Sequence, residues 1–140
     1  MKLVGFNFTK IHAEKSSEQP KEIKINTSVN ILEITELKSD FLKSKEDMIG
    51  IKFNYGIDYS PNFAKIELSG VIIISVDSKE SKEVLRQWKD KKVPDNFKLA
   101  IFNIILSKAN IKAIQLEDEF NLPIHINMPS LRPTTEKKKE

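Results

Sequence analysis

Side chains that could perform acid, base, nucleophilic or metal chemistry are few in this chain of 140 residues. It contains no cysteine and two histidines, His12 and His125. Thiolate catalysis needs a cysteine, and structural zinc sites need several Cys or His ligands. The composition therefore argues against both. His12 falls in a strand pattern and His125 in a proline-rich end, with no third ligand in view. We expect each to be a surface or packing residue, with no bound metal or cofactor.

The carboxylates give an equally weak signal for catalysis. Glu117, Asp118 and Glu119 cluster near the expected end of a long helix, where a solvated terminus is the ordinary setting. The glycines are isolated, and none of them opens a helix as a phosphate-binding loop would require. The sequence therefore indicates a protein that is not an enzyme.

The net charge of +3 suggests nucleic acid as one alternative partner. Phe53 and Tyr55, on one strand, could stack bases as sheet-based single-strand binders do. They share their face with isoleucines, however, so core packing is favoured. Much of the charge lies in the tail with Lys137–Lys139, and arginine, the residue suited to bidentate phosphate contacts, is nearly absent. We expect no nucleic-acid partner.

Four segments alternate between apolar and polar residues with the period of a strand: 3–14, 23–31, 49–59 and 64–76. The phase shifts at Ile11, as at a bulge, and breaks again at Leu32. The polar run that ends in Pro20 predicts a crossover, and Ser60-Pro61-Asn62 predicts the turn of a hairpin. Gly56 and Gly70 interrupt strands, which favours bulges or close backbone approach. Residues 38–47 are expected to form a charged loop or a short helical turn.

After Asp77 the apolar period changes to that of helices. Asp77 or Ser78 can cap a first helix that contains Trp88 and ends in the charged run 89–92. Pro94-Asp95 begins a second helix that continues to about Glu119, followed by an extended segment, 122–129. The fold class is α+β: a four-stranded antiparallel sheet with a short and a long C-terminal helix on one face. We expect one domain, residues 1–133, and a disordered basic tail, 134–140.

The long helix is apolar on two sides, which predicts self-association. One stripe runs from Leu99 through Phe102 and Ala109 to Phe120, and a second cluster comprises Phe97, Ile101, Ile104 and Ile105. One face can cover the sheet, and the other needs a cover as well, because exposed apolar patches of this size mark contact surfaces. We expect the second cluster to form an oligomer interface.

This order of elements resembles that of the SecB protein-export chaperone family and its archaeal SecB-like relatives. Three local patterns agree: residues 6–11 look like the family's first strand, residues 19–25 look like its entry to the second, and residues 122–129 are similar to the proline-bearing stretch after its long helix. The resemblance spans nearly the whole chain.

The resemblance implies binding of unfolded polypeptide clients without ATP, by a homo-oligomer that is a dimer of dimers. It implies packing through the long helices and the first strands, which adds Phe6 and Phe8 to the interface. It also implies an apolar client groove near the second strand, with Ile23, Ile25 and Thr27 in its wall. Position alone adds Leu122, Ile124 and Met128 to that groove.

Bacterial members continue into a helix that covers the groove and a tail that contacts the motor ATPase SecA. Since this chain stops soon after Pro133, we expect no SecA contact. With no apolar run of membrane-spanning length and no leader pattern, we expect a cytoplasmic protein without membrane insertion. A general holdase is the leading hypothesis, whether it serves export or protects a specific client. An interaction protein with one dedicated protein partner, and a sheet-based nucleic-acid module, are the alternatives.

Overall fold

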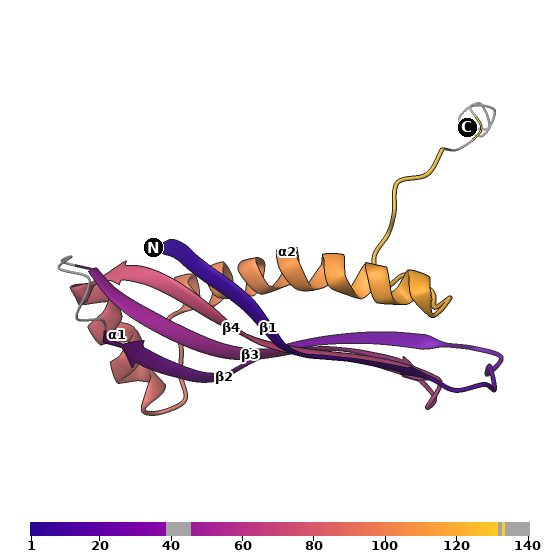
Figure 1. Cartoon of the computed structure of the whole chain (residues 1–140), viewed down its shortest axis with the longest axis horizontal. Coiled ribbons are helices and arrows are strands. Elements are labelled where there is room, and N and C mark those ends of the chain that lie inside the picture. Colours follow the sequence, from indigo (N-terminus) through magenta and orange to yellow (C-terminus); the bar gives the residue numbers. More distant parts are fainter. Residues whose placement is uncertain (39–45, 132, 134–140) are drawn as a thin grey trace, which may run out of the picture.

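The computed structural model describes residues 1–38, 46–131 and 133. Its strands are β1 (Lys2–Lys15), β2 (Lys24–Leu37), β3 (Glu46–Ser60) and β4 (Ala64–Asp77), followed by the helices α1 (Ser78–Trp88) and α2 (Asp95–Glu119). The strands form one sheet in the order β1-β4-β3-β2, and every neighbouring pair is antiparallel. The α+β fold predicted from the sequence is confirmed, and β1 and β2 are the two edges of the sheet (Figure 1).

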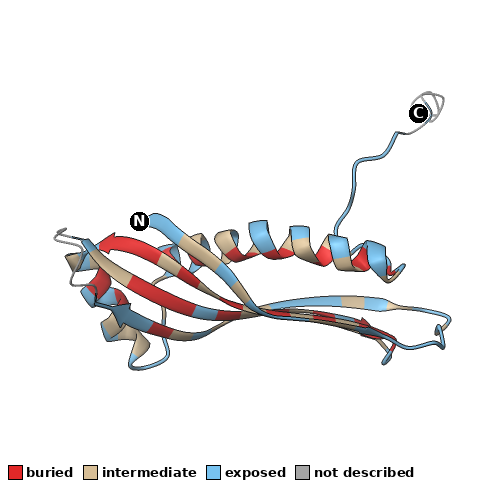
Figure 2. Cartoon of the chain, viewed as in Figure 1, coloured by how far each residue is buried: buried red, intermediate tan, exposed pale blue. Residues whose placement is uncertain are grey.

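One face of the sheet is buried because every second residue of β3 and β4 is apolar. In β3 these residues run from Ile49 to Tyr59, and in β4 from Ala64 to Val76. α1 contacts β2, β3 and β4 on this face, and α2 contacts β3 and β4. Burial therefore concentrates in the two central strands and along one side of α2 (Figure 2). Residues 134–140, predicted to be a disordered tail, lie outside the described residues, as does most of the predicted loop 38–47.

Both edge strands carry bulges; those near Ile11 and Leu32 lie where the sequence changes phase, and the one after Leu3 was not predicted. The pairing of β1 with β4 shifts between Leu3 and Gly5 and again between Phe8 and Lys10, and β2 shifts against β3 between Ile31 and Glu33. The second β1 shift lies beside Gly70, where a Cβ atom would collide with the backbone oxygen of Asn7 and the ring of Phe53. Close backbone approach, one of the two predicted reasons for this glycine, is thus confirmed.

The opposite face of the sheet is polar and carries exposed ion pairs. The ammonium of Lys10 lies 3.0 Å from Glu67, and that of Lys52 lies 3.2 Å from Glu33. Hydrogen bonds from lysines, first of all Lys10, lower the pKa of Glu67. His12, half-exposed, contacts Glu14 at 3.2 Å, so it is the surface residue that the sequence predicts.

α1 begins and ends at well-formed caps. The side chain of Asp77 accepts a hydrogen bond of 2.7 Å from the backbone N–H of Glu80, as predicted for an N-cap. At the other end, the N–H groups of Lys92 and Lys91 donate to the carbonyls of Gln87 and Trp88, at 3.1 and 2.8 Å. This is the Schellman arrangement, and it places Lys91 at φ 58°, a left-handed position that glycine usually occupies.

α2 runs along the sheet, and its buried side corrects one sequence expectation (Figure 1). Phe97, Ile101 and Ile105, predicted to lie in an oligomer interface, are buried in the core of the single chain. Leu99, placed on the other stripe, is 63% exposed. The sequence of a helix that is apolar on two sides does not show which side packs on the sheet. The prediction of an oligomer interface was therefore wrong for Phe97, Ile101 and Ile105. Phe6, Phe8 and Ile104 are only partly buried, so the interface prediction stays open for them.

By length and composition alone, α2 is also apolar enough to cross a membrane. Its apolar character has a source within the fold, because Phe97, Ile101, Ile105, Ala109 and Ala113 pack on the sheet.

Candidate binding groove

A groove lies where the edge strand β2 meets the end of α1 and the beginning of α2. Its volume is about 480 Å³. The residues that line it are Val29, Asn30, Ile31, Leu32, Trp88, Lys91, Val93, Lys98 and Phe102. The connection between α1, which ends at Trp88, and α2, which starts at Asp95, adds Lys91 and Val93 to this lining.

Most of the residues that line the groove are apolar, beside the polar Asn30 and two lysines. Val29, Ile31, Trp88, Val93 and Phe102 are partly buried and pack against the core while they also line the groove. Trp88 is the single tryptophan of the chain. The groove therefore presents two aromatic rings beside a strand edge, a surface suited to apolar side chains of an extended segment.

Two lysines stand over these aromatic rings. The ammonium of Lys91 lies 4.7 Å from the centre of the Trp88 ring, and that of Lys98 lies 5.5 Å from the centre of the Phe102 ring. Both distances are within the range of cation–π attraction. The rim of the groove is thus positively charged directly beside its apolar walls.

A second feature, a buried polar cluster, lies near the other end of α2. Glu117 is fully buried, and its carboxylate accepts hydrogen bonds from the Tyr59 hydroxyl and, at 3.0 Å, from the backbone N–H of His125. The Nδ1 atom of the His125 ring lies 2.9 Å from Glu117 Oε1. The expectation of a solvated Glu117 was wrong, and His125 is a buried packing residue with polar partners rather than a surface residue.

The cluster continues to Tyr55 and Asn110. The Tyr55 hydroxyl donates to Asn110 Oδ1 at 2.8 Å, and His125 Nε2 lies 2.9 Å from both of these oxygens. Burial, and secondarily the charge of Glu117, raises the pKa of Tyr55; burial and the hydrogen bond to Glu117 raise the pKa of Tyr59. Because these five side chains hydrogen-bond to one another, the cluster holds the segment after α2 in place.

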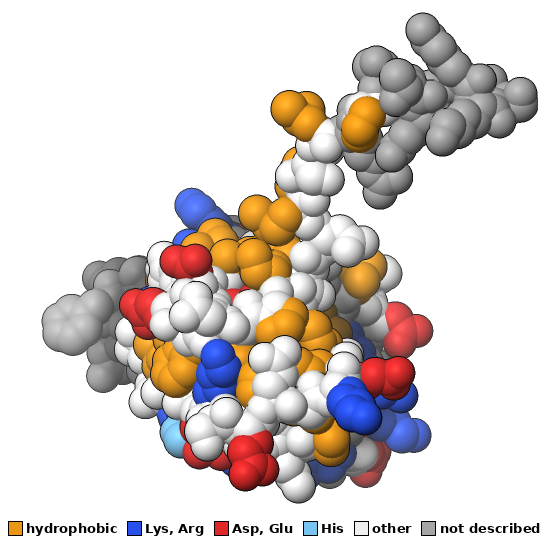
Figure 3. All heavy atoms as spheres, turned by 90° about the vertical axis from the view of Figure 1, so that its right-hand side faces the viewer, with side chains coloured by type: hydrophobic (Ala, Val, Ile, Leu, Met, Phe, Trp, Pro, Cys, Tyr) orange, Lys and Arg blue, Asp and Glu red, His pale blue; other side chains and the backbone are white. Residues whose placement is uncertain are grey.

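A turn at the end of α2 makes this cluster possible. Asn121 adopts a left-handed φ of 53°, and the N–H of Leu122 donates to the carbonyl of Glu117 at 2.8 Å. Pro123 and His125 are thereby directed back onto the sheet. Beyond them the chain leaves the body of the molecule, and hydrophobic side chains gather around the base of this segment (Figure 3).

The six residues predicted for a client groove are not brought into one pocket. Ile23 and Ile25 pack partly against the core, and Leu122 is a core residue. Thr27, Ile124 and Met128 are exposed. None of the six lines the groove described above, although Ile25 and Thr27 precede Val29 and Ile31 on the same strand and face.

Sequence reasoning missed the aromatic walls of the groove, Trp88 and Phe102. They come from different helices, and no local pattern shows that the helices meet at β2. Phe53 and Tyr55, considered as residues that could stack on bases, are buried. This confirms that they pack in the core, where they cannot contact a nucleic acid. Among the described residues there is no group of three or more His, Cys, Asp or Glu that could hold a metal ion.

No protein-family model matches the sequence, and no curated protein sequence matches it. Among solved structures, the chain is similar to a SecB-like chaperone of Mycobacterium tuberculosis, solved in complex with a peptide from an antitoxin. The two chains are 9% identical; the match covers 94% of this chain and 91% of that chain, with a TM-score of 0.48. At this level of identity, the groove and the polar cluster have to be interpreted from the residues of this chain.

Proposed function

We propose that this protein binds extended, non-native polypeptide segments in the groove beside β2, without a nucleotide. The observation that carries the proposal is an apolar groove with two aromatic walls directly beside an open sheet edge. The sequence resemblance to the SecB family suggested such an activity near the second strand, and the groove beside β2 supports it with lining residues other than those that the resemblance implied.

The physical basis is what all unfolded chains have in common. Every one of them offers a backbone with unpaired N–H and C=O groups and intermittent apolar side chains. Up to the bulge after Ile31, the edge of β2 presents matching backbone groups, and the groove beside it accepts apolar side chains. Binding at each point is weak, so a client that offers several segments to an oligomer gains by multivalency.

The size of the groove favours a second candidate, a dedicated protein partner. A volume of about 480 Å³ accommodates a few side chains, and the described lining is short. One short motif from one partner would fill it. The two candidates share the groove and differ in how many sequences it accepts.

The experiment that tests the proposal is light scattering of a chemically denatured, aggregation-prone protein diluted with and without this protein, no nucleotide added. We expect suppression near stoichiometric ratios and a severalfold loss of suppression with Phe102→Asp, which places a charge in the groove. Leu99→Asp is the matched control, since it adds the same charge to the exposed side of the same helix.

Circular dichroism of both variants shows whether each is folded. Equal suppression by Phe102→Asp and Leu99→Asp would exclude the groove as the binding site. No suppression at severalfold excess of the wild type would exclude a general holdase and leave the dedicated partner.

A further inference from the structure

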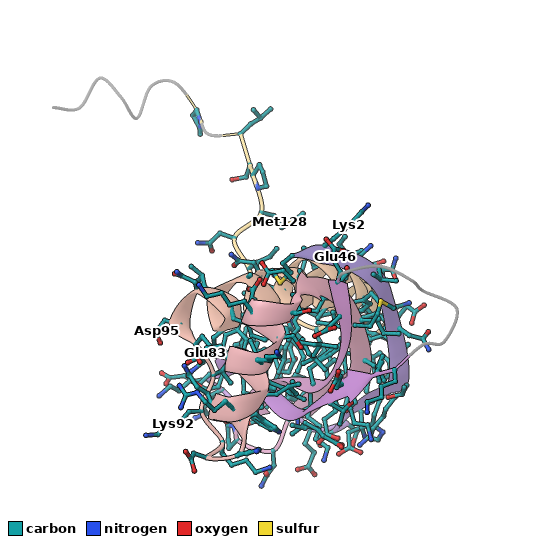
Figure 4. All side chains as sticks on the ribbon, turned by 90° about the vertical axis from the view of Figure 1, so that its left-hand side faces the viewer. Lys2, Glu46, Glu83, Lys92, Asp95 and Met128 are labelled. Atoms are coloured by element: carbon teal, nitrogen blue, oxygen red, sulfur yellow. The ribbon has the colours of Figure 1, made fainter. Side chains whose placement is uncertain are left out.

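The charged residues that line the groove have one sign. Lys91 and Lys98 belong to the lining, and no carboxylate does within the described ranges, 1–38, 46–131 and 133. Asp90 and Asp95 lie in or next to the same turn but outside the lining, and Figure 4 shows Lys92 and Asp95 on the outer side of this region. A segment that enters the groove therefore meets positive charge at its rim.

The backbone holds one of these lysines in an uncommon conformation. Lys91 has φ 58° in the Schellman turn, where glycine avoids a steric cost of about 1 kcal/mol that other residues bear. This conformation coincides with the position of its ammonium over Trp88, 4.7 Å from the ring centre. A non-glycine residue with a left-handed φ is a reason to look for a role at that position. Here the role available to it is to place a charge at the groove.

The geometry links the charges to the apolar walls. An apolar side chain in the groove lies near the rings of Trp88 and Phe102, over which the ammonium groups of Lys91 and Lys98 lie. In an extended segment, side chains two residues apart share a face and lie about 6.6 Å apart, so the residues two positions before and after the inserted one face the rim that carries Lys91 and Lys98. A carboxylate at those positions would pair with a lysine, and an ammonium would be repelled.

We propose that the groove selects extended polypeptide segments in which one large apolar side chain is flanked by aspartate or glutamate. This inference rests on the proposed function, because it names the class of polypeptide that the groove binds. The occupant is a segment of another protein with acidic flanks, chosen by charge complementarity with the lysine rim.

The test uses the full chain and three synthetic peptides that share one central leucine and differ only in the residues two positions before and after it: glutamate, glutamine or lysine. None contains tryptophan, so the fluorescence of Trp88 reports binding in the groove itself. We expect the glutamate peptide to bind about fivefold more tightly than the glutamine peptide, from two partly screened ion pairs. The lysine peptide should bind most weakly, and raising the salt concentration should reduce the differences.

Charge removal at the rim completes the test. In the double variant Lys91→Gly and Lys98→Gln, glycine keeps the left-handed turn, and we expect the glutamate and glutamine peptides to bind equally. The control double variant, Lys82→Gln and Lys108→Gln, removes the same charge from exposed positions of the two helices outside the groove and should retain the preference.

The outcomes separate the two proposals. Equal binding of all three peptides by the wild type would overturn the acidic selection and leave polypeptide binding intact. A loss of preference in the control variant as well would show that net charge, not the rim, is responsible, which also overturns it. Failure of every peptide to change Trp88 fluorescence would overturn both proposals.

Discussion

The two tyrosines of the chain, Tyr55 and Tyr59, both belong to the buried polar cluster around Glu117. Their pKa values are raised, chiefly by burial, so the native state keeps both hydroxyls protonated where an unfolded tyrosine, with a pKa of about 10, ionises. Above that pH the unfolded state binds fewer protons than the native state. The free energy of unfolding should then fall as the pH rises, by up to about 1.4 kcal/mol per pH unit for each tyrosine.

A spectrophotometric titration checks this expectation, since both tyrosines report on the same cluster. Tyrosinate absorbance should appear only together with the loss of native circular dichroism. Tyr59→Phe should lower stability at neutral pH by about 1–3 kcal/mol, because it removes a donor from the buried Glu117, and should make the alkaline loss of stability less steep. Ionisation of either tyrosine near its ordinary pKa in a folded wild-type protein would contradict the assignment.

At the scale of elements, local patterns account for most of the fold. Alternation predicted the four strands, phase shifts marked the bulged regions around Ile11 and Leu32, and Asp77 and Asp95 marked the starts of the helices. These features depend on neighbours in the sequence. The burial of Glu117 does not, because it depends on a turn at Asn121 that returns His125 to the sheet from eight residues further along the chain.

The groove was unpredictable for a related reason. Trp88 is the last residue of one helix and Phe102 lies in the next, and only the tertiary arrangement beside β2 brings both into one groove. Ile25 and Thr27, wall residues that the resemblance implied, lie on the same strand and face as Val29 and Ile31 but outside the groove lining. The position along the strand is tertiary information that alternation does not contain.

The polar cluster attaches the segment after α2 to the sheet, and this attachment can be measured. His125→Ala removes the contacts to Glu117, Tyr55 and Asn110, so we expect faster cleavage by thermolysin within residues 122–131 while the sheet stays intact. Limited proteolysis followed by mass spectrometry locates the cut. His12→Ala is the control, since it removes an exposed histidine from β1, and equal cleavage of the two variants would show that the cluster does not hold the segment.

At the scale of the whole molecule, the exposed apolar residues of the β1 edge predict contact with a second copy. Leu3 and Ile11 are 43% and 50% exposed, and Phe6 and Phe8 are partly buried. We expect self-association at micromolar concentration, with Ile11→Glu shifting the protein toward monomer. Ile111→Glu changes a similarly exposed residue on α2 and should have less effect. Analytical ultracentrifugation gives the size, and a monomeric wild type would exclude this interface.

Because the sheet has two unlike free edges, this protein also carries a risk of unlimited polymerisation. Pairing β1 with β1 obeys a two-fold axis and stops at two copies, whereas pairing β1 of one copy with β2 of the next is a head-to-tail contact that can repeat into a ribbon. The bulges at both edges interrupt the straight ladder that such a ribbon needs. The bulges therefore oppose edge-to-edge pairing between copies. We expect a redesign that removed them to favour fibrils.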